Sequence, residues 1–145
     1  MNTTFTMNGV DMRAKLSALW IYVFLNMIFR DLHELGRPGF LEEVMTGVVG
    51  GVRVTDGVML IGGIMIAVPL LIIPLTHFLR LKASRLANIL IGALHLVITV
   101  GVNRTPDLDD VFFAVIEIAA LLLIIRLAWS WKEHTAQTGA TDQEM

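Results

Sequence analysis

Three side chains that could carry acid–base or hydrogen-bond chemistry lie inside long apolar stretches of the sequence: Asn26, His95 and Glu117. Ionisable groups inside a lipid bilayer cost several kcal/mol and normally face a bundle interior, a cavity or a partner. By helical rise, Glu117 and His95 each lie about 9–10 Å from the same side of the apolar layer. A carboxylate and an imidazole at matched depth could share one site, and proton transfer between them is one option.

These residues belong to stripes of polar and small side chains at helical spacing. The stripes comprise Tyr22, Asn26, Arg30 and His33; Asn88, Gly92, His95 and Thr99; and Ala114, Glu117, Leu121 and Ala128. If all three stripes point inward, they predict a polar pocket with Arg30 and Asp31 near its mouth. Small and polar residues also serve as packing surface between membrane helices, so a purely structural interpretation stays open. Glu117 favours function, because an acid at this depth has no packing advantage over glutamine.

Motifs for other chemistry do not occur in the sequence. There are no cysteines, and the four histidines form no H-x-x-x-H or H-E-x-x-H pattern. No Walker loop, G-x-G-x-x-G or G-x-S-x-G motif is present. We therefore predict no cofactor, no metal site and no catalytic residue, and an enzyme is the last of the functional classes that we consider.

The elements that must position the polar residues are four apolar segments. A bilayer core about 30 Å thick needs roughly 20 apolar residues in a helix. The spans are predicted at about 14–35, 57–79, 85–102 and 110–131, in a single transmembrane domain over 1–132 with a polar, disordered tail at 133–145. Thr55 is placed to cap the second span, and Pro69 and Pro74 predict a bend within it. The fold class is therefore all-α, an integral membrane four-helix bundle.

Composition supports a lipid-facing surface. Of the 145 residues, 17% are charged and 55% are hydrophobic, and the mean hydropathy is +0.70. A small soluble domain cannot hide so many apolar residues in one core. The net charge of -2 offers no basic patch for nucleic acid. The lipid bilayer is the partner that composition predicts.

The distribution of basic residues predicts the orientation. One side of the predicted bundle carries both termini and the loop at 77–85, with the bases Arg13, Lys15, Arg80, Lys82, Arg85, Arg126 and Lys132. The other side mixes four arginines with eight acids. The positive-inside rule then places both termini in the cytoplasm, with the protein in the plasma membrane. Trp20, Trp129 and Trp131 fall near that cytoplasmic boundary, where an aromatic belt is expected.

The connection at 30–56 is the one long loop of this layout. Residues 40–49 could form a short amphipathic helix on the membrane interface. Gly47, Gly50 and Gly51 weaken that prediction, and a structured lid fits the sequence equally well.

Several motifs resemble a family of small bacterial four-span proteins of unknown function. They are the stretches 16–23 and 25–27, Met45-Thr46-Gly47, 54–57, 85–89, 112–118 and Ala128-Trp129-Ser130-Trp131. The resemblance covers about residues 14–132, implies the four-span fold in a bacterial inner membrane and places Asn26, Asn88 and Glu117 in recognisable motifs. The layout is also similar to the DoxX-like group, some of whose members are associated with quinone-linked redox chemistry.

The leading functional prediction is binding of a small amphipathic molecule, a lipid or a quinone, in an outer-leaflet polar pocket. Its ligand-binding residues are predicted to be Asn26, Arg30, Asn88, His95, Thr99 and Glu117. One alternative is a proton-coupled transporter or efflux component that acts as a homodimer, because four helices are few for an alternating-access pathway. Another alternative is an accessory subunit of a larger membrane complex.

Overall fold

Four helices in the computed structural model are long and apolar enough to cross a membrane. The structure describes residues 8–102 and 108–131. The four candidate spans are Met12–Glu34, Asp56–Phe78, Leu81–Gly101 and Leu108–Ser130. They agree with the predicted spans to within a few residues, and the third begins earlier than expected. The predicted tail at 133–145 lies outside the described residues.

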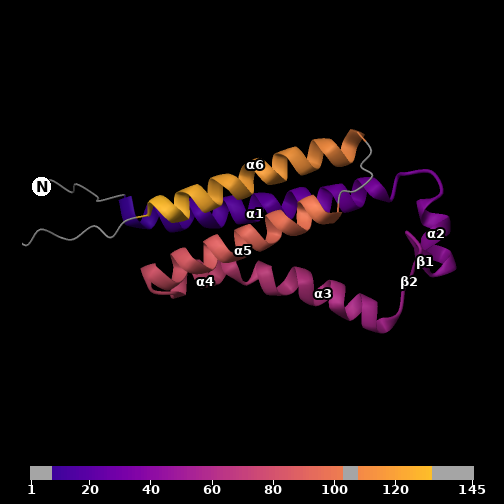
Figure 1. Ribbon diagram of the computed structural model, residues 1–145, viewed down its shortest axis with the longest axis horizontal. Helices are drawn as coiled ribbons and strands as arrows, with labels where there is room; N and C mark the ends of the chain where they lie inside the picture. The colour runs from indigo at the N-terminus through magenta and orange to yellow at the C-terminus, as the bar shows by residue number, and fades with distance from the viewer. Residues whose placement is uncertain (1–7, 103–107, 132–145) are drawn as a thin grey trace, which may run out of the picture.

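Three of the helices pack side by side along their length: α1 (Asn8–Glu34), α5 (Leu81–Val102) and α6 (Leu108–Ser130) (Figure 1). The short helix α4 (Ile72–Phe78) packs against α1 and α5. The start of α1, the turn between α4 and α5 and the end of α6 lie together at one end of the bundle, which we call the terminal end. The opposite end is called the hairpin end.

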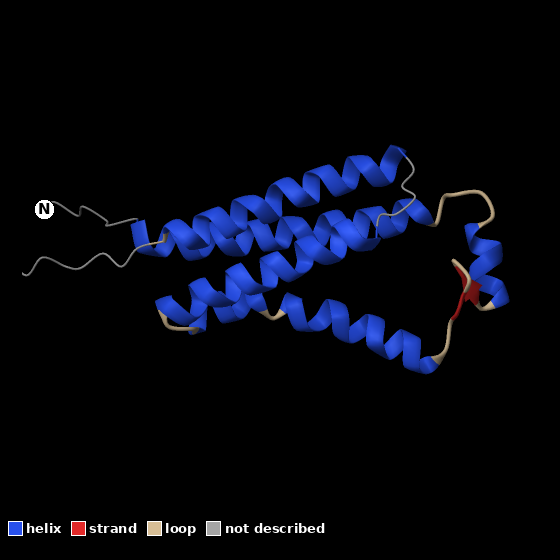
Figure 2. Ribbon diagram, viewed as in Figure 1, coloured by secondary structure: helices blue, strands red, loops and turns tan. Residues whose placement is uncertain are grey.

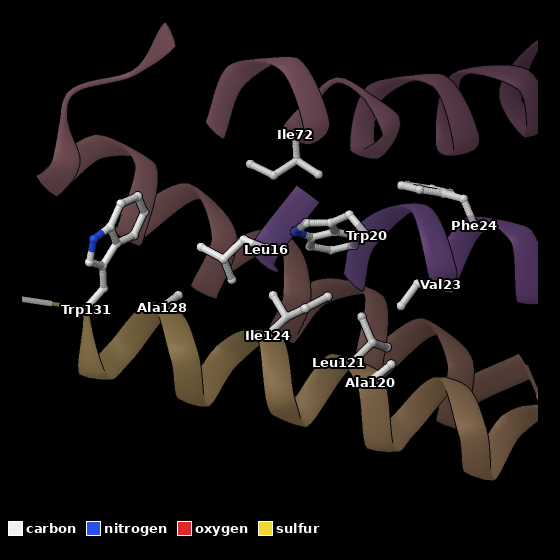
Figure 3. Close-up of a cluster of buried hydrophobic side chains, with 10 residues drawn as sticks. All are labelled: Leu16, Trp20, Val23, Phe24, Ile72, Ala120, Leu121, Ile124, Ala128 and Trp131. Atoms are coloured by element: carbon white, nitrogen blue, oxygen red, sulfur yellow. The ribbon is translucent and has the colours of Figure 1, made fainter. Parts of the chain in front are cut away.

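An apolar core fills the space between α1, α4 and α6 toward the terminal end (Figure 3). Leu16, Trp20 and Val23 of α1 meet Leu121 and Ile124 of α6, and all five are fully buried. Trp20 therefore does not belong to an interfacial aromatic belt, and that prediction was wrong for this residue. Trp131 is also buried, with the guanidinium of Arg13 5.4 Å from its ring centre, whereas Trp129 is 71% exposed.

The second span is broken into two helices, and its first half diverges from the bundle. The N-terminal half, α3 (Asp56–Leu70), is capped by Thr55, whose hydroxyl accepts a hydrogen bond from the amide of Val58 at 3.3 Å. Residues 56–68 are all exposed, and α3 leans away from α1 and α5 toward the hairpin end (Figure 1). The break falls at Leu71, between Pro69 and Pro74. Pro74 has no amide proton to donate to the carbonyl of Leu70, four residues before it, and its ring clashes with that carbonyl, so the helix is interrupted there.

The hairpin end carries a helix and a β-hairpin between α1 and α3 (Figure 2). The helix α2 (Phe40–Thr46) ends at Gly47, which adopts a left-handed conformation. The strands β1 (Val48–Val49) and β2 (Val52–Arg53) pair antiparallel through a turn in which Gly50 and Gly51 have positive φ, as tight hairpins require. The short helix predicted over residues 40–49 therefore ends at Thr46, and Val48 and Val49 form a strand instead.

Candidate functional site

The polar stripe of α5 faces the bundle interior, as its spacing predicted. Asn88, His95 and Thr99 are at most 5% exposed. Gly92 lies between them, and a Cβ added there would lie 3.1 Å from Cγ1 of Ile125. The glycine therefore allows α5 and α6 to approach closely. The stripe of α6 is also buried, including Ala114, Glu117, Leu121 and Ala128.

Glu117 is the centre of a polar cluster with Arg30, His95 and Thr99. The hydroxyl of Thr99 donates a hydrogen bond to Oε1 of Glu117 at 2.6 Å. Nε2 of His95 lies 3.3 Å from the same oxygen, and Nη1 of Arg30 lies 3.8 Å from Oε2. Oε2 accepts no hydrogen bond from the described part of the chain. Three helices thus converge on one carboxylate, and α1 contributes the guanidinium of Arg30.

The polar cluster is closed rather than hollow. Glu117 is 1% exposed and His95 is 5% exposed. The imidazole of His95 packs edge-on against the rings of Trp20 and Phe24, with centroids 6.3 and 6.1 Å away. Its Nε2 lies 3.1 Å from the sulfur of Met27. These aromatic and thioether side chains line the terminal side of the cluster, so a ligand would have to lie beside the cluster and not within it.

Asn88 belongs to a different polar network, nearer the terminal end. Its Oδ1 accepts a hydrogen bond from Nε1 of Trp20 at 2.8 Å. Its Nδ2 donates to Oγ1 of Thr76 at 3.0 Å and to the carbonyl of Ser84 at 2.8 Å. All four residues are fully buried. Asn88 therefore lies apart from Glu117, although the sequence predicted one shared pocket. Its hydrogen bonds join α1, α4 and α5.

Asn26 lies beside the Glu117 cluster and lines a groove between α1 and α6. Its Nδ2 donates to the carbonyl of Phe113 at 3.1 Å. The groove has a volume of about 390 Å³ and is lined by Tyr22, Leu25, Asn26, Phe29, His33 and Phe113. Tyr22 and His33 had been expected on an inward face, but both are exposed in this groove. We call this feature the α1–α6 groove.

Sequence reasoning missed the aromatic walls of the groove and the partners of Asn88. Phe29 and Phe113 are ordinary members of apolar helices, and only their spacing carries a signal. Phe113 precedes Glu117 by four residues, and Phe29 follows Asn26 by three, so both lie near the polar stripes. Within the described ranges, no group of three or more His, Cys, Asp or Glu side chains could hold a metal ion.

Comparison with known proteins identifies the family but no activity. A family model described as a family of unknown function (DUF6326) matches residues 5–138. Searches of curated proteins and of solved structures gave no match. The likeness of the layout to the DoxX-like group stays a prediction. Because the match extends over most of the chain, this protein belongs to the DUF6326 family of unknown function.

Proposed function

We propose that this protein is a multi-pass membrane protein that binds a small amphipathic molecule, a lipid or a quinone, in the α1–α6 groove. The observation that carries the proposal is the composition of the groove. Leu25, Phe29 and Phe113 give it apolar walls, and Asn26 and His33 add polar groups. Binding sites for small molecules commonly combine apolar walls with a few polar groups in a volume of about 300–1,000 Å³.

The exposure of the groove residues supports entry from the lipid phase. Tyr22, Leu25 and Phe29 are 50%, 48% and 59% exposed on a helix that is long enough to span a bilayer. An amphipathic molecule dissolved in the membrane would therefore reach the groove sideways, without passing through water. The closed Glu117 cluster supports this site indirectly, since it ties α1, α5 and α6 together one turn from Asn26 and Phe113.

The proposed location is the bacterial inner membrane, with the terminal end in the cytoplasm. Basic side chains gather at that end and hold its helix termini. Arg13 donates hydrogen bonds to the carbonyls of Thr76, His77 and Leu79. Arg85 donates to the carbonyls of Ala128 and Trp129 at 3.1 and 2.9 Å. The positive-inside rule then assigns the hairpin end, and the groove near it, to the outer half of the membrane.

A photocrosslinking experiment tests the proposal. A photoreactive phenylalanine analogue is placed at Phe29, which lines the groove, and in a second protein at Phe112, which is similarly exposed but does not line it. After irradiation of living cells, mass spectrometry identifies the attached molecules. A discrete small-molecule adduct at position 29, against a mixture of bulk lipids at position 112, supports binding. The same mixture at both positions would contradict it.

A second candidate function, an accessory subunit of a membrane complex, is favoured by α3. Among the described residues, and apart from the adjacent residues and backbone of α3 itself, no heavy atom lies within 4 Å of a Cβ built at Gly62 or Gly63. Close helix contacts in membranes often use small residues of this kind, and the apolar helix of a partner could pack there. Replacing Gly63 with Leu should then abolish co-purification of a stoichiometric partner. Purification of the wild-type protein from native membranes without any such partner would refute this candidate.

A further inference from the structure

A second hollow adjoins the α1–α6 groove at the hairpin end. It has a volume of about 490 Å³ and is lined by Leu32, His33, Gly36, Arg37 and Asp109. His33 lines both hollows, so the two lie next to each other. The groove is mainly apolar, whereas this hollow presents opposite charges on its walls. We call it the charged hollow.

The length of the groove matches one leaflet of a bilayer. Along α1, the groove extends from Tyr22 to His33. Eleven residues of helix rise by about 16 Å. Half of a hydrocarbon core about 30 Å thick is about 15 Å. An acyl chain in the groove would therefore end where the charged hollow begins, at the depth of the lipid headgroups.

The charges of this hollow favour a headgroup that carries both signs. Arg37 comes from the turn after α1, where the carboxylate of Glu34 and the ring of Phe40 hold its guanidinium. Its side chain is 44% exposed, and a guanidinium has five N–H donors, so Arg37 can bind a phosphate while it keeps its partners within the protein. Asp109 lies in the first turn of α6 and makes no ion pair with any residue that the structure describes. A primary ammonium group would complement this carboxylate.

We propose that the groove and the charged hollow together form one binding site for a phospholipid whose headgroup carries a primary ammonium, such as phosphatidylethanolamine. This inference rests on the proposed function and narrows its ligand class. Arg37 contacts the phosphate, Asp109 accepts hydrogen bonds from the ammonium, and the groove holds an acyl chain. A choline headgroup offers Asp109 no N–H donor. A glycerol headgroup leaves a net negative charge beside the carboxylate, and a quinone carries no charge for either residue.

The test measures lipid retention by the full chain in detergent, with phosphatidylethanolamine, phosphatidylcholine and phosphatidylglycerol supplied in equal amounts and counted by native mass spectrometry. A charge-assisted hydrogen bond of about 1.4 kcal/mol predicts roughly a tenfold preference for phosphatidylethanolamine over phosphatidylcholine. Asp109→Asn should reduce this preference to near unity. The matched control is Asp110→Asn, which makes the same change in charge one residue further along, outside the charged hollow.

The outcomes separate this inference from the function on which it rests. Equal effects of Asp109→Asn and Asp110→Asn, or equal retention of all three lipids by the wild type, would overturn the headgroup assignment while binding itself stands. Failure of the wild type to retain any lipid would overturn both. Arg37→Gln supplies an independent check, because it should weaken all three phospholipids to a similar extent.

Discussion

Replacing Asn88 with Ala should destabilise the bundle far more than truncating an exposed side chain of α5. Asn88 is fully buried and makes hydrogen bonds to α1 through Trp20 and to the region of α4 through Thr76. Alanine removes both bonds and leaves the indole N–H of Trp20 without its acceptor. The substitution therefore tests whether this network joins three helices or merely fills space.

The expected magnitude follows from the contacts. Hydrogen bonds between membrane helices average about 0.6 kcal/mol, so the two interhelical bonds contribute about 1.2 kcal/mol. The orphaned indole N–H and the space left by the side chain add roughly 1 kcal/mol. We expect Asn88→Ala to lower the free energy of unfolding by about 2 kcal/mol. Leu90→Ala on the same helix should change it little, because Leu90 is 58% exposed.

The assay is reversible unfolding in mixed micelles with increasing sodium dodecyl sulfate, followed by far-ultraviolet circular dichroism. A double-mutant cycle with Trp20→Phe isolates the Trp20–Asn88 hydrogen bond, and a coupling energy of about 0.6–1.7 kcal/mol is expected. Equal stabilities of Asn88→Ala and Leu90→Ala, or a coupling energy near zero, would refute the role given to this network.

Three further predictions address packing, the cluster and the diverging helix. Gly92→Val should destabilise the bundle by about 1–3 kcal/mol because its side chain would overlap α6, whereas Gly63→Val should leave monomer stability unchanged; similar losses in chemical unfolding would contradict this. Glu117→Gln should cost about 1 kcal/mol and Glu117→Ala about 2 kcal/mol, because glutamine can still accept the threonine hydrogen bond; equal unfolding energies would count against the cluster. Because the chain has no cysteine, spin labels attached at Leu60→Cys and Val97→Cys can report on α3 without background labelling. Electron paramagnetic resonance should give a broad distribution of long distances between the two labels, because α3 diverges from α5. A narrow distribution of short distances would instead show that α3 packs on α5.

The sequence was sufficient to predict the four helices and the inward faces of α5 and α6. Span lengths follow from bilayer thickness, and the stripe through Gly92, His95 and Thr99 faces inward because its spacing is helical. The proximity of Glu117 and His95 was also predicted from their matched depth along the helices, whereas Arg30 was expected at the mouth of the pocket. These features depend on local periodicity and on length, which a sequence shows directly.

Other features depend on which helices pack together, and local patterns do not carry that information. Trp20 and Asn88 are 68 residues apart, so nothing near Trp20 shows that its indole has a buried partner. The sequence also could not predict that α3 diverges from the bundle, because the apolar side chains of α3 can contact lipid as well as another helix. The strand at Val48–Val49 depends on the turn made by Gly50 and Gly51. In the sequence these glycines indicated only that a helix would not continue through them, and they did not predict a β-hairpin.

The central claim, that the α1–α6 groove holds an amphipathic molecule, is tested most directly by native mass spectrometry of the gently solubilised protein beside two variants. Leu25→Trp fills the groove, whereas Ile21→Trp places the same side chain on α1 outside it. The two native residues are 48% and 46% exposed, so the substitutions are matched. We predict a small-molecule adduct on the wild type and Ile21→Trp that is lost from Leu25→Trp. An adduct retained by all three folded proteins, or present on none, would contradict the claim.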